Sequence, residues 1–304
     1  MKSIRIVLVA IGVALQIPLF AAAQPVAVLP NTFQGKFDFK VAEGTVLQAT
    51  LQLPDGSGTF PLVVIMHGGV GISELEAQDV ADLRSRGYAT AVVNSFSGRN
   101  FKPESGTGAG ASLRPTVRVA DAYAALNVLV THPQIDKQRT VLFGRSHAGA
   151  TVMIAATTWA KGRYSSDGAA YKAFIALYPA CHVTYPEFDS LTGPLRLHLG
   201  SKDDLTPAKS CVTIASRMQA HGQDVKLTVY PDAHHAFDLN GPVSYSGQWL
   251  NYGACNLQLA SVDTPLPVDE VKQCVRRGTS QGGNPQATAI FRQNAAKELA
   301  ELLR

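Results

Sequence analysis

An apolar run that ends in a glycine-flanked serine is the feature that most constrains how this chain folds. Residues 140–143, Thr-Val-Leu-Phe, precede Gly-Arg-Ser-His-Ala-Gly at 144–149, and a segment with helical spacing follows. A strand, a sharp turn and a helix in this order form a nucleophile elbow, whose small flanking residues let the turn raise the serine oxygen above the sheet. We therefore predict that Ser146 is a nucleophile, although Ala148 stands where glycine is more common.

A carboxylate turn and a histidine loop follow Ser146 in the order that this architecture requires. Asp203 and Asp204 lie in the turn after one predicted strand, and His234 and His235 lie in the loop after the next. Because parallel strands bind ligands at the edge where their carboxyl ends meet, we expect the serine, one acid and one histidine to converge there. The pattern itself leaves open which neighbour of each pair takes part.

Alternating strand-like and helix-like segments predict an α/β fold with a mostly parallel sheet. An antiparallel hairpin is expected first, over residues 37–53, because the pattern alternates and turns at Glu43 and Gly44. The other expected strands are residues 62–66, 89–93, 140–143, 173–178, 194–199 and 225–230, and the expected helices are residues 74–86, 116–130, a segment from about 147, and 287–304. No internal repeat or linker divides this series, so we expect a single α/β domain over residues 24–304.

Composition limits the classes of function. The 304 residues are 46% hydrophobic and 16% charged, which allows a full buried core. The formal net charge is only +4, without a basic run or an interleaved aromatic stripe, so we expect no nucleic-acid partner. The spacing of cysteines and histidines shows no metal-binding pattern, and we expect no metal.

The first residues are typical of an export signal. Two positive charges precede an apolar stretch over residues 6–20, which ends in Ala-Ala-Ala before Gln24. The stretch is shorter than the roughly 20 apolar residues of a membrane span, and Gln16 and Pro18 interrupt it. We expect a signal peptide over residues 1–23, cleavage after Ala23, a periplasmic or secreted mature protein and no stable membrane anchor.

All four cysteines lie after this signal, which favours disulfides in an exported chain. Three pairings are open, and we favour Cys181 with Cys211 and Cys255 with Cys274. If the chain were not exported, four free buried thiols would be the better interpretation.

Residues 240–286 interrupt the strand and helix rhythm. They are rich in glycine and proline and show no clear helix or strand pattern. Because long irregular segments in compact domains are often functional, we expect an insertion that forms a rim over the active site, with a surface insertion of no role as the alternative.

A serine nucleophile also needs backbone N–H groups that stabilise the developing oxyanion. The N–H of His147 is one candidate, because it directly follows the serine. The second should come from the loop after the strand at 62–66, where the sequence His-Gly-Gly-Val-Gly begins at residue 67. We favour Gly69, with Val70 as the near alternative.

These motifs together resemble the dienelactone hydrolase family of α/β-hydrolases. The resemblance rests on residues 67–69, 94–96, 144–149, 178–181, 200–207 and 230–238. It implies an α/β-hydrolase fold for the domain and hydrolysis of a small-molecule ester or lactone without metal or cofactor. It also favours Asp203 and His235 over their neighbours, because the family's acid turn and histidine context match those two positions. Family members that open dienelactone use a cysteine nucleophile, whereas this chain has serine.

Two arginines near these motifs are candidates for binding a substrate carboxylate. Arg99 follows residues 94–96, and Arg145 is adjacent to the serine. The alternative for each is a solvated or internally paired guanidinium.

Two other classes of function remain open: a serine peptidase that cleaves amides, and a hydrolase-like protein that binds without catalysis.

Overall fold

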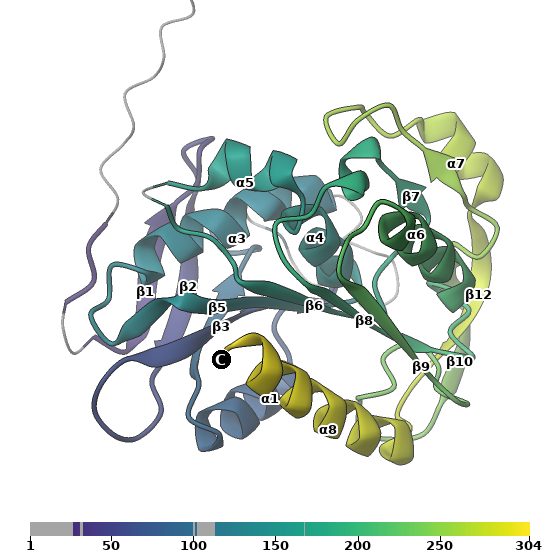
Figure 1. The fold of residues 1–304 in the computed structure, drawn as a ribbon. Coiled ribbons are helices and arrows are strands. Elements are labelled where there is room, and N and C mark those ends of the chain that lie inside the picture. Colours follow the sequence, from purple (N-terminus) through teal and green to yellow (C-terminus); the bar gives the residue numbers. More distant parts are fainter. Residues whose placement is uncertain (1–26, 31–32, 100, 102–112, 167) are drawn as a thin grey trace, which may run out of the picture.

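A central sheet of eight strands forms the middle layer of the protein (Figure 1). The computed structural model describes residues 27–30, 33–99, 101, 113–166 and 168–304. In spatial order the strands are β1 (Gly35–Lys40), β2 (Val46–Gln52), β4 (Ala89–Asn94), β3 (Phe60–Met66), β5 (Ile135–Arg145), β6 (Ala173–Leu177), β8 (Leu195–Gly200) and β9 (Val225–Tyr230). The last six are mutually parallel, and β1 and β2 form the antiparallel hairpin at one edge. The predicted α/β class and mostly parallel sheet are confirmed.

Helices cover both faces of this sheet (Figure 1). One face carries α3 (Pro115–Leu129), α4 (His147–Ala155), α5 (Thr158–Tyr164) and α6 (Ala208–Ala220), and the other carries α1 (Glu74–Ser85) and α8 (Pro285–Leu302). Alternate residues of β3 belong to the two separate apolar clusters, with Val64 in one and Val63 and Ile65 in the other. Burial on both faces explains why this strand is a continuous apolar run in the sequence.

The closing helix packs as its sequence pattern predicts. Phe291 and Leu299 are buried in the cluster between α8 and the sheet, and Ala295 and Leu302 pack against the same cluster. Their spacing of three to four residues places them on one side of the helix.

The rim, residues 240–286, differs from the prediction. It contains an antiparallel pair, β10 (Ser244–Asn251) with β12 (Arg276–Gln281), and the helix α7 (Val268–Cys274). A short strand, β11 (Leu257–Gln258), pairs with β7 (Val183–Thr184), which precedes a 3-10 helix at Pro186–Asp189. The prediction of no regular structure was wrong because most residues of β10 are exposed or half-buried, so no apolar alternation marks the strand.

Both favoured cysteine pairs are bonded in the structure. Cys181, after β6, is joined to Cys211 in α6, and Cys255 is joined to Cys274 at the end of α7. No helix among the described residues is long and apolar enough to cross a membrane. The expected signal peptide lies outside the described residues, and its cleavage after Ala23 stays a prediction.

Candidate active site

Ser146 lies at the sharp turn between β5 and α4. Its backbone has φ 54° and ψ −119°, a strained conformation for a residue with a side chain. The turn also requires glycine nearby, because a Cβ on Gly144 would lie 2.8 Å from the carbonyl oxygen of Ala148, and one on Gly149 would lie 2.9 Å from Pro179. The methyl group of Ala148 is accommodated in this elbow, where it is fully buried.

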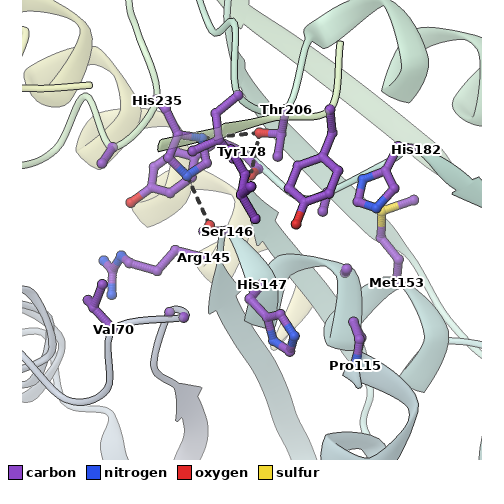
Figure 2. A pocket seen from close by; sticks show the side chains of 18 of the residues that line it. Val70, Pro115, Arg145, Ser146, His147, Met153, Tyr178, His182, Thr206 and His235 are labelled. Carbon is purple, nitrogen blue, oxygen red and sulfur yellow. Dashed lines mark hydrogen bonds between the residues drawn. The ribbon is translucent and has the colours of Figure 1, made fainter. Parts of the chain in front are cut away.

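His235 connects Ser146 to Asp203 (Figure 2 shows the contact with Ser146). The distance from His235 Nε2 to Ser146 Oγ is 2.9 Å, and that from His235 Nδ1 to Asp203 Oδ2 is 2.8 Å. A carboxylate can only accept, so Nδ1–H donates to Asp203 and the Nε2 lone pair accepts from the serine hydroxyl. This is the arrangement in which a histidine can take a proton from serine.

Asp204 and His234, the neighbours of Asp203 and His235, are not part of this arrangement. Asp204 Oδ1 accepts a hydrogen bond of 2.9 Å from the backbone N–H of Ser280 in β12. His234 Nδ1 is buried without a hydrogen-bond partner among the described residues. The geometry thus brings Asp203 and His235, and not their neighbours, to the serine.

Thr206 supports the acid and the histidine, and sequence reasoning did not single it out. Its hydroxyl lies 3.0 Å from Asp203 Oδ2 and 3.1 Å from His235 Nδ1. The backbone N–H groups of Leu205 and Thr206 both donate to Asp203 Oδ1, at 3.0 and 2.8 Å. These bonds orient the carboxylate toward the imidazole. The one available signal was the position of Thr206 in the acid turn.

Tyr178 packs against the ring of His235. Its ring meets that of His235 edge to face, with centroids 4.8 Å apart, and its hydroxyl donates to Asp238 Oδ1 at 2.6 Å. Burial, and then the negative charge of Asp238, raise the pKa of this phenol, which keeps it a neutral donor.

The candidate oxyanion donors lie on both sides of the serine. His147 begins α4, and the N–H groups of the first helical turn have no acceptor within the helix. Gly69 and Val70 follow β3 and line the same cavity as Ser146. Neither of their N–H groups donates to another described residue. The N–H groups of Gly69 and Val70 are therefore both free to act as the second oxyanion donor, and the geometry does not choose between them.

Arg118, on α3, contacts both His147 and His67, the residue at the start of the Gly69 loop, and no motif in the sequence pointed to it. Its buried guanidinium donates to the carbonyl oxygen of His67 at 2.6 Å, to His147 Nδ1 at 3.0 Å and to Ser95 Oγ at 3.2 Å. Desolvation, and then the charge of Arg118, lower the pKa of His147 to about 3 and that of His67 well below its usual value. Both imidazoles are therefore neutral at pH 7.

The two arginines predicted to bind substrate are both engaged in internal ion pairs. Arg99 forms a two-bond contact with the carboxylate of Asp121, at 2.8 and 2.9 Å, and a further ion pair with Glu43. Residues 100 and 102–112, which follow Arg99, lie outside the described residues. This guanidinium is occupied within the protein, so the internally paired alternative describes it.

Arg145 is more deeply buried, with 4% of its side chain exposed. It pairs with Glu76 at 3.2 Å, Asp79 at 2.7 Å and Asp238 at 3.1 Å. Three carboxylates around one guanidinium leave no charge to attract an anionic substrate. The substrate-binding prediction for Arg145 is corrected to a structural role behind the elbow.

A cavity of about 420 Å³ opens at Ser146. Figure 2 shows Ser146 and His147 in its middle, Val70 and Arg145 toward one end, and Met153 and His182 toward the other. Apolar and aromatic side chains make up most of its wall, including Met153, Ile154, Tyr185, Phe188, Leu205, Leu239, Trp249, Tyr252, Leu266 and Val271. Within the described ranges, no group of three or more histidine, cysteine, aspartate or glutamate side chains is placed to hold a metal ion.

The fold and this arrangement of serine, histidine and aspartate define an α/β-hydrolase. The family model of the dienelactone hydrolase family matches residues 47–248, well over half of the chain, and the chain belongs to that family.

Comparison with known proteins gives a distant relative in sequence and two solved structures that share the fold. The chain is 24% identical over 255 residues to acylamino-acid-releasing enzyme 1 of Oryza sativa subsp. japonica, covering 70% of this chain but only 32% of that protein. A dienelactone hydrolase-like promiscuous phosphotriesterase from metagenomic libraries superposes with a TM-score of 0.62 at 14% identity, covering 89% of this chain and 99% of that one. An esterase from Thermogutta terrifontis gives a TM-score of 0.53 at 15% identity, covering 67% and 85%.

Proposed function

We propose that this protein is a serine hydrolase that cleaves a carboxylic ester or lactone through an acyl-enzyme. The observation that carries the proposal is the pair of distances that link Ser146 to His235 and His235 to Asp203, beside a largely apolar cavity that Ser146 and His235 line. Membership of the dienelactone hydrolase family supports the same class of reaction.

The reaction begins when His235 Nε2 takes the proton of the Ser146 hydroxyl as Oγ attacks the ester carbonyl carbon. Asp203 stabilises the imidazolium that forms. The N–H of His147 and that of Gly69 or Val70 stabilise the oxyanion. Collapse of the tetrahedral intermediate breaks the ester C–O bond, and the imidazolium protonates the departing alkoxide.

A second cycle then releases the acid. His235 removes a proton from water, the hydroxide oxygen attacks the acyl-enzyme carbonyl, and the Ser146 oxygen leaves with the proton from His235. Proton transfers through His235 balance both halves of the reaction, so the proposed steps require no redox partner and no metal.

The test is turnover of a series of p-nitrophenyl esters, from acetate to long acyl chains, by the wild-type protein and by Ser146→Ala. We expect hydrolysis only by the wild-type protein, because the variant lacks the nucleophile. Equal turnover by the purified, folded variant would overturn the mechanism. No turnover and no labelling by a fluorophosphonate would favour the binding-protein alternative.

Amide hydrolysis is the second candidate, and the match to the rice acylamino-acid-releasing enzyme favours it. An amide nitrogen leaves less readily than an alkoxide, so the two candidates differ in the substrates that they cleave. The p-nitroanilide that corresponds to the best ester separates them. Comparable kcat/KM values for the two would support a peptidase-like enzyme.

We also propose that the protein is exported. The two disulfides support an oxidising compartment, periplasmic or extracellular, and the pattern of residues 1–23 supports a signal peptide. The mass of the mature protein tests this, since cleavage after Ala23 predicts Gln24 as the first residue.

A further inference from the structure

Two stacked rings form part of the cavity wall that lies away from the elbow. The imidazole of His182 lies against the phenol ring of Tyr252, with centroids 4.3 Å apart and planes 7° from parallel. His182 comes from the segment after β6 and Tyr252 from the rim, so the pair joins the core of the protein to the insertion. In Figure 2, His182 lies beside Met153 at the end of the cavity opposite Val70.

Several independent contacts hold these two rings in place. The carbonyl of His182 accepts from the N–H of Leu257, at the start of the β7 and β11 pair. The N–H of Tyr252 donates to the carbonyl of Leu205, in the acid turn. His182 directly follows the disulfide-bonded Cys181, and Tyr252 accepts a backbone hydrogen bond from the disulfide-bonded Cys255. The pair is thus preformed, which lowers the entropic cost of binding a ligand against it.

His182 is the polar group of this wall that lacks a partner. Neither of its ring nitrogens hydrogen-bonds to another described residue, and because Nδ1 is fully buried, Nε2 is the nitrogen that a ligand in the cavity can reach. Desolvation lowers the pKa of the imidazole to about 4, so the ring is uncharged at pH 7. A neutral imidazole carries one donor and one acceptor. An unsatisfied polar atom in an apolar wall favours a ligand that supplies the missing hydrogen bond.

The charged cluster at the Arg145 end of the cavity does not favour an anion, because three carboxylates surround this guanidinium. Arg114 also lines the cavity, and its guanidinium donates to the carbonyl oxygen of Thr264. Aromatic side chains and the thioether of Met153 make favourable contacts with flat rings.

From these observations we infer that the cavity selects an ester with an uncharged, flat ring, and that His182 forms a hydrogen bond to a polar substituent on that ring. This inference rests on the proposed ester hydrolysis. His182 and Tyr252 then determine specificity for the substrate. The rim contributes one of these two rings, that of Tyr252.

The experiment measures kcat/KM for p-nitrophenyl esters of benzoic, 4-hydroxybenzoic, 4-carboxybenzoic and hexanoic acid. The proteins are wild type, His182→Phe, which keeps a ring against Tyr252 but removes the polar atoms, and His221→Phe, a surface control. In the wild-type protein we expect both uncharged ring esters to exceed the hexanoate and the carboxybenzoate by about tenfold. The ratio of hydroxybenzoate to benzoate should fall about five- to tenfold in His182→Phe alone, because one hydrogen bond is lost.

Each kcat/KM is first divided by the rate constant for alkaline hydrolysis of the same ester, which corrects for the intrinsic reactivity of the esters compared within one protein. An unchanged ratio in His182→Phe would overturn the assigned hydrogen bond. Preference for hexanoate would overturn selection of a flat ring. Preference for the carboxybenzoate, abolished in Arg114→Gln, would overturn the requirement for an uncharged ring.

Measurements of ester binding test this inference independently of the proposed reaction. Trp249 lines the cavity, so tryptophan fluorescence should report binding of each intact ester to Ser146→Ala. If no ester is hydrolysed by the wild-type protein, the proposed reaction fails. The selectivity is then decided by dissociation constants, with the same fold-changes expected between Ser146→Ala and the double variant that also carries His182→Phe.

Discussion

The backbone N–H of Ser280 donates a 2.9 Å hydrogen bond to Asp204, the residue next to the acid that holds His235. A second contact attaches the rim to the histidine itself, because the N–H of Gly282 donates to the His235 carbonyl at 3.0 Å. The rim is therefore hydrogen-bonded to the side chain of Asp204 and to the backbone of His235. It shapes the cavity and also stabilises the loops that carry the acid and the histidine.

This relationship predicts different outcomes for the two adjacent aspartates. Asp203→Ala should lower kcat for the best ester by about 10⁴-fold, because the imidazole loses its orienting carboxylate. Asp204→Ala should lower kcat by less than about tenfold and make the rim less stable, since it loses only the bond to Ser280. Steady-state kinetics and thermal unfolding check both. A larger loss of kcat in Asp204→Ala would contradict the assignment of the acid.

Thr206 should matter for catalysis more than for folding. Thr206→Val keeps the shape of the side chain but removes the hydroxyl beside Asp203 and His235. We expect kcat to fall about tenfold and the pH profile of kcat/KM to shift, since a hydrogen bond to a charged group contributes about 1.5 to 3 kcal/mol. Thr213→Val, an exposed position on α6, is the matched control. Equal kinetics for the two variants would show that the hydroxyl has no part in positioning the histidine.

The carboxylates around Arg145 make stability depend on pH. Burial raises the pKa of Asp79 from 3.8 to about 6 against the opposing charge of Arg145. Between these values the folded protein binds more protons than the unfolded chain, so this group lowers the free energy of unfolding as pH rises from about 4 to about 6. The expected change is on the order of 2 kcal/mol.

Urea unfolding from pH 4 to pH 7 measures this effect. Asp79→Asn should lose that part of the pH dependence, whereas Asp82→Asn, on the same helix and paired with Arg86 at the surface, should keep it. Parallel stability curves for Asp79→Asn and the wild-type protein would contradict the raised pKa.

The two disulfides should protect different parts of the molecule. Cys255 and Cys274 close a segment within the rim, and Lys272 in that segment is exposed. In Cys255→Ser/Cys274→Ser, trypsin should cleave after Lys272 at least about tenfold faster, because the segment opens locally without its cross-link. Cys181→Ser/Cys211→Ser should leave this rate unchanged while lowering the free energy of global unfolding by about 3 kcal/mol. Identical cleavage rates in both variants would refute a local role for the rim disulfide.

The sequence predicted what depends on local pattern. Residues 140–149 combine the end of a buried strand, two glycines and the start of a helix in ten consecutive positions, so the elbow follows from local sterics. The order of acid and histidine after Ser146 is likewise a linear feature. The favoured cysteine pairs followed from their places beside predicted elements.

Several of the contacts that the sequence did not predict join groups far apart in the chain. Arg145 meets Asp79 and Asp238, which are 66 and 93 residues away, and no pattern in the sequence indicates that they converge. Arg118 reaches His67 across 51 residues in the same way. The rim strands were not predicted because most of their residues are exposed or half-buried. A strand is recognised in a sequence by alternating apolar and polar residues, and that alternation arises only where one face is buried.

Covalent labelling of Ser146 tests the central claim most directly. The protein is treated with a fluorophosphonate, digested and analysed by mass spectrometry, beside Ser146→Ala and His235→Ala. The account predicts one adduct, on Ser146, which is absent from Ser146→Ala and forms at least about 10³-fold more slowly in His235→Ala, because the histidine activates the serine. An adduct on another residue, or labelling of Ser146→Ala at the wild-type rate, would contradict it.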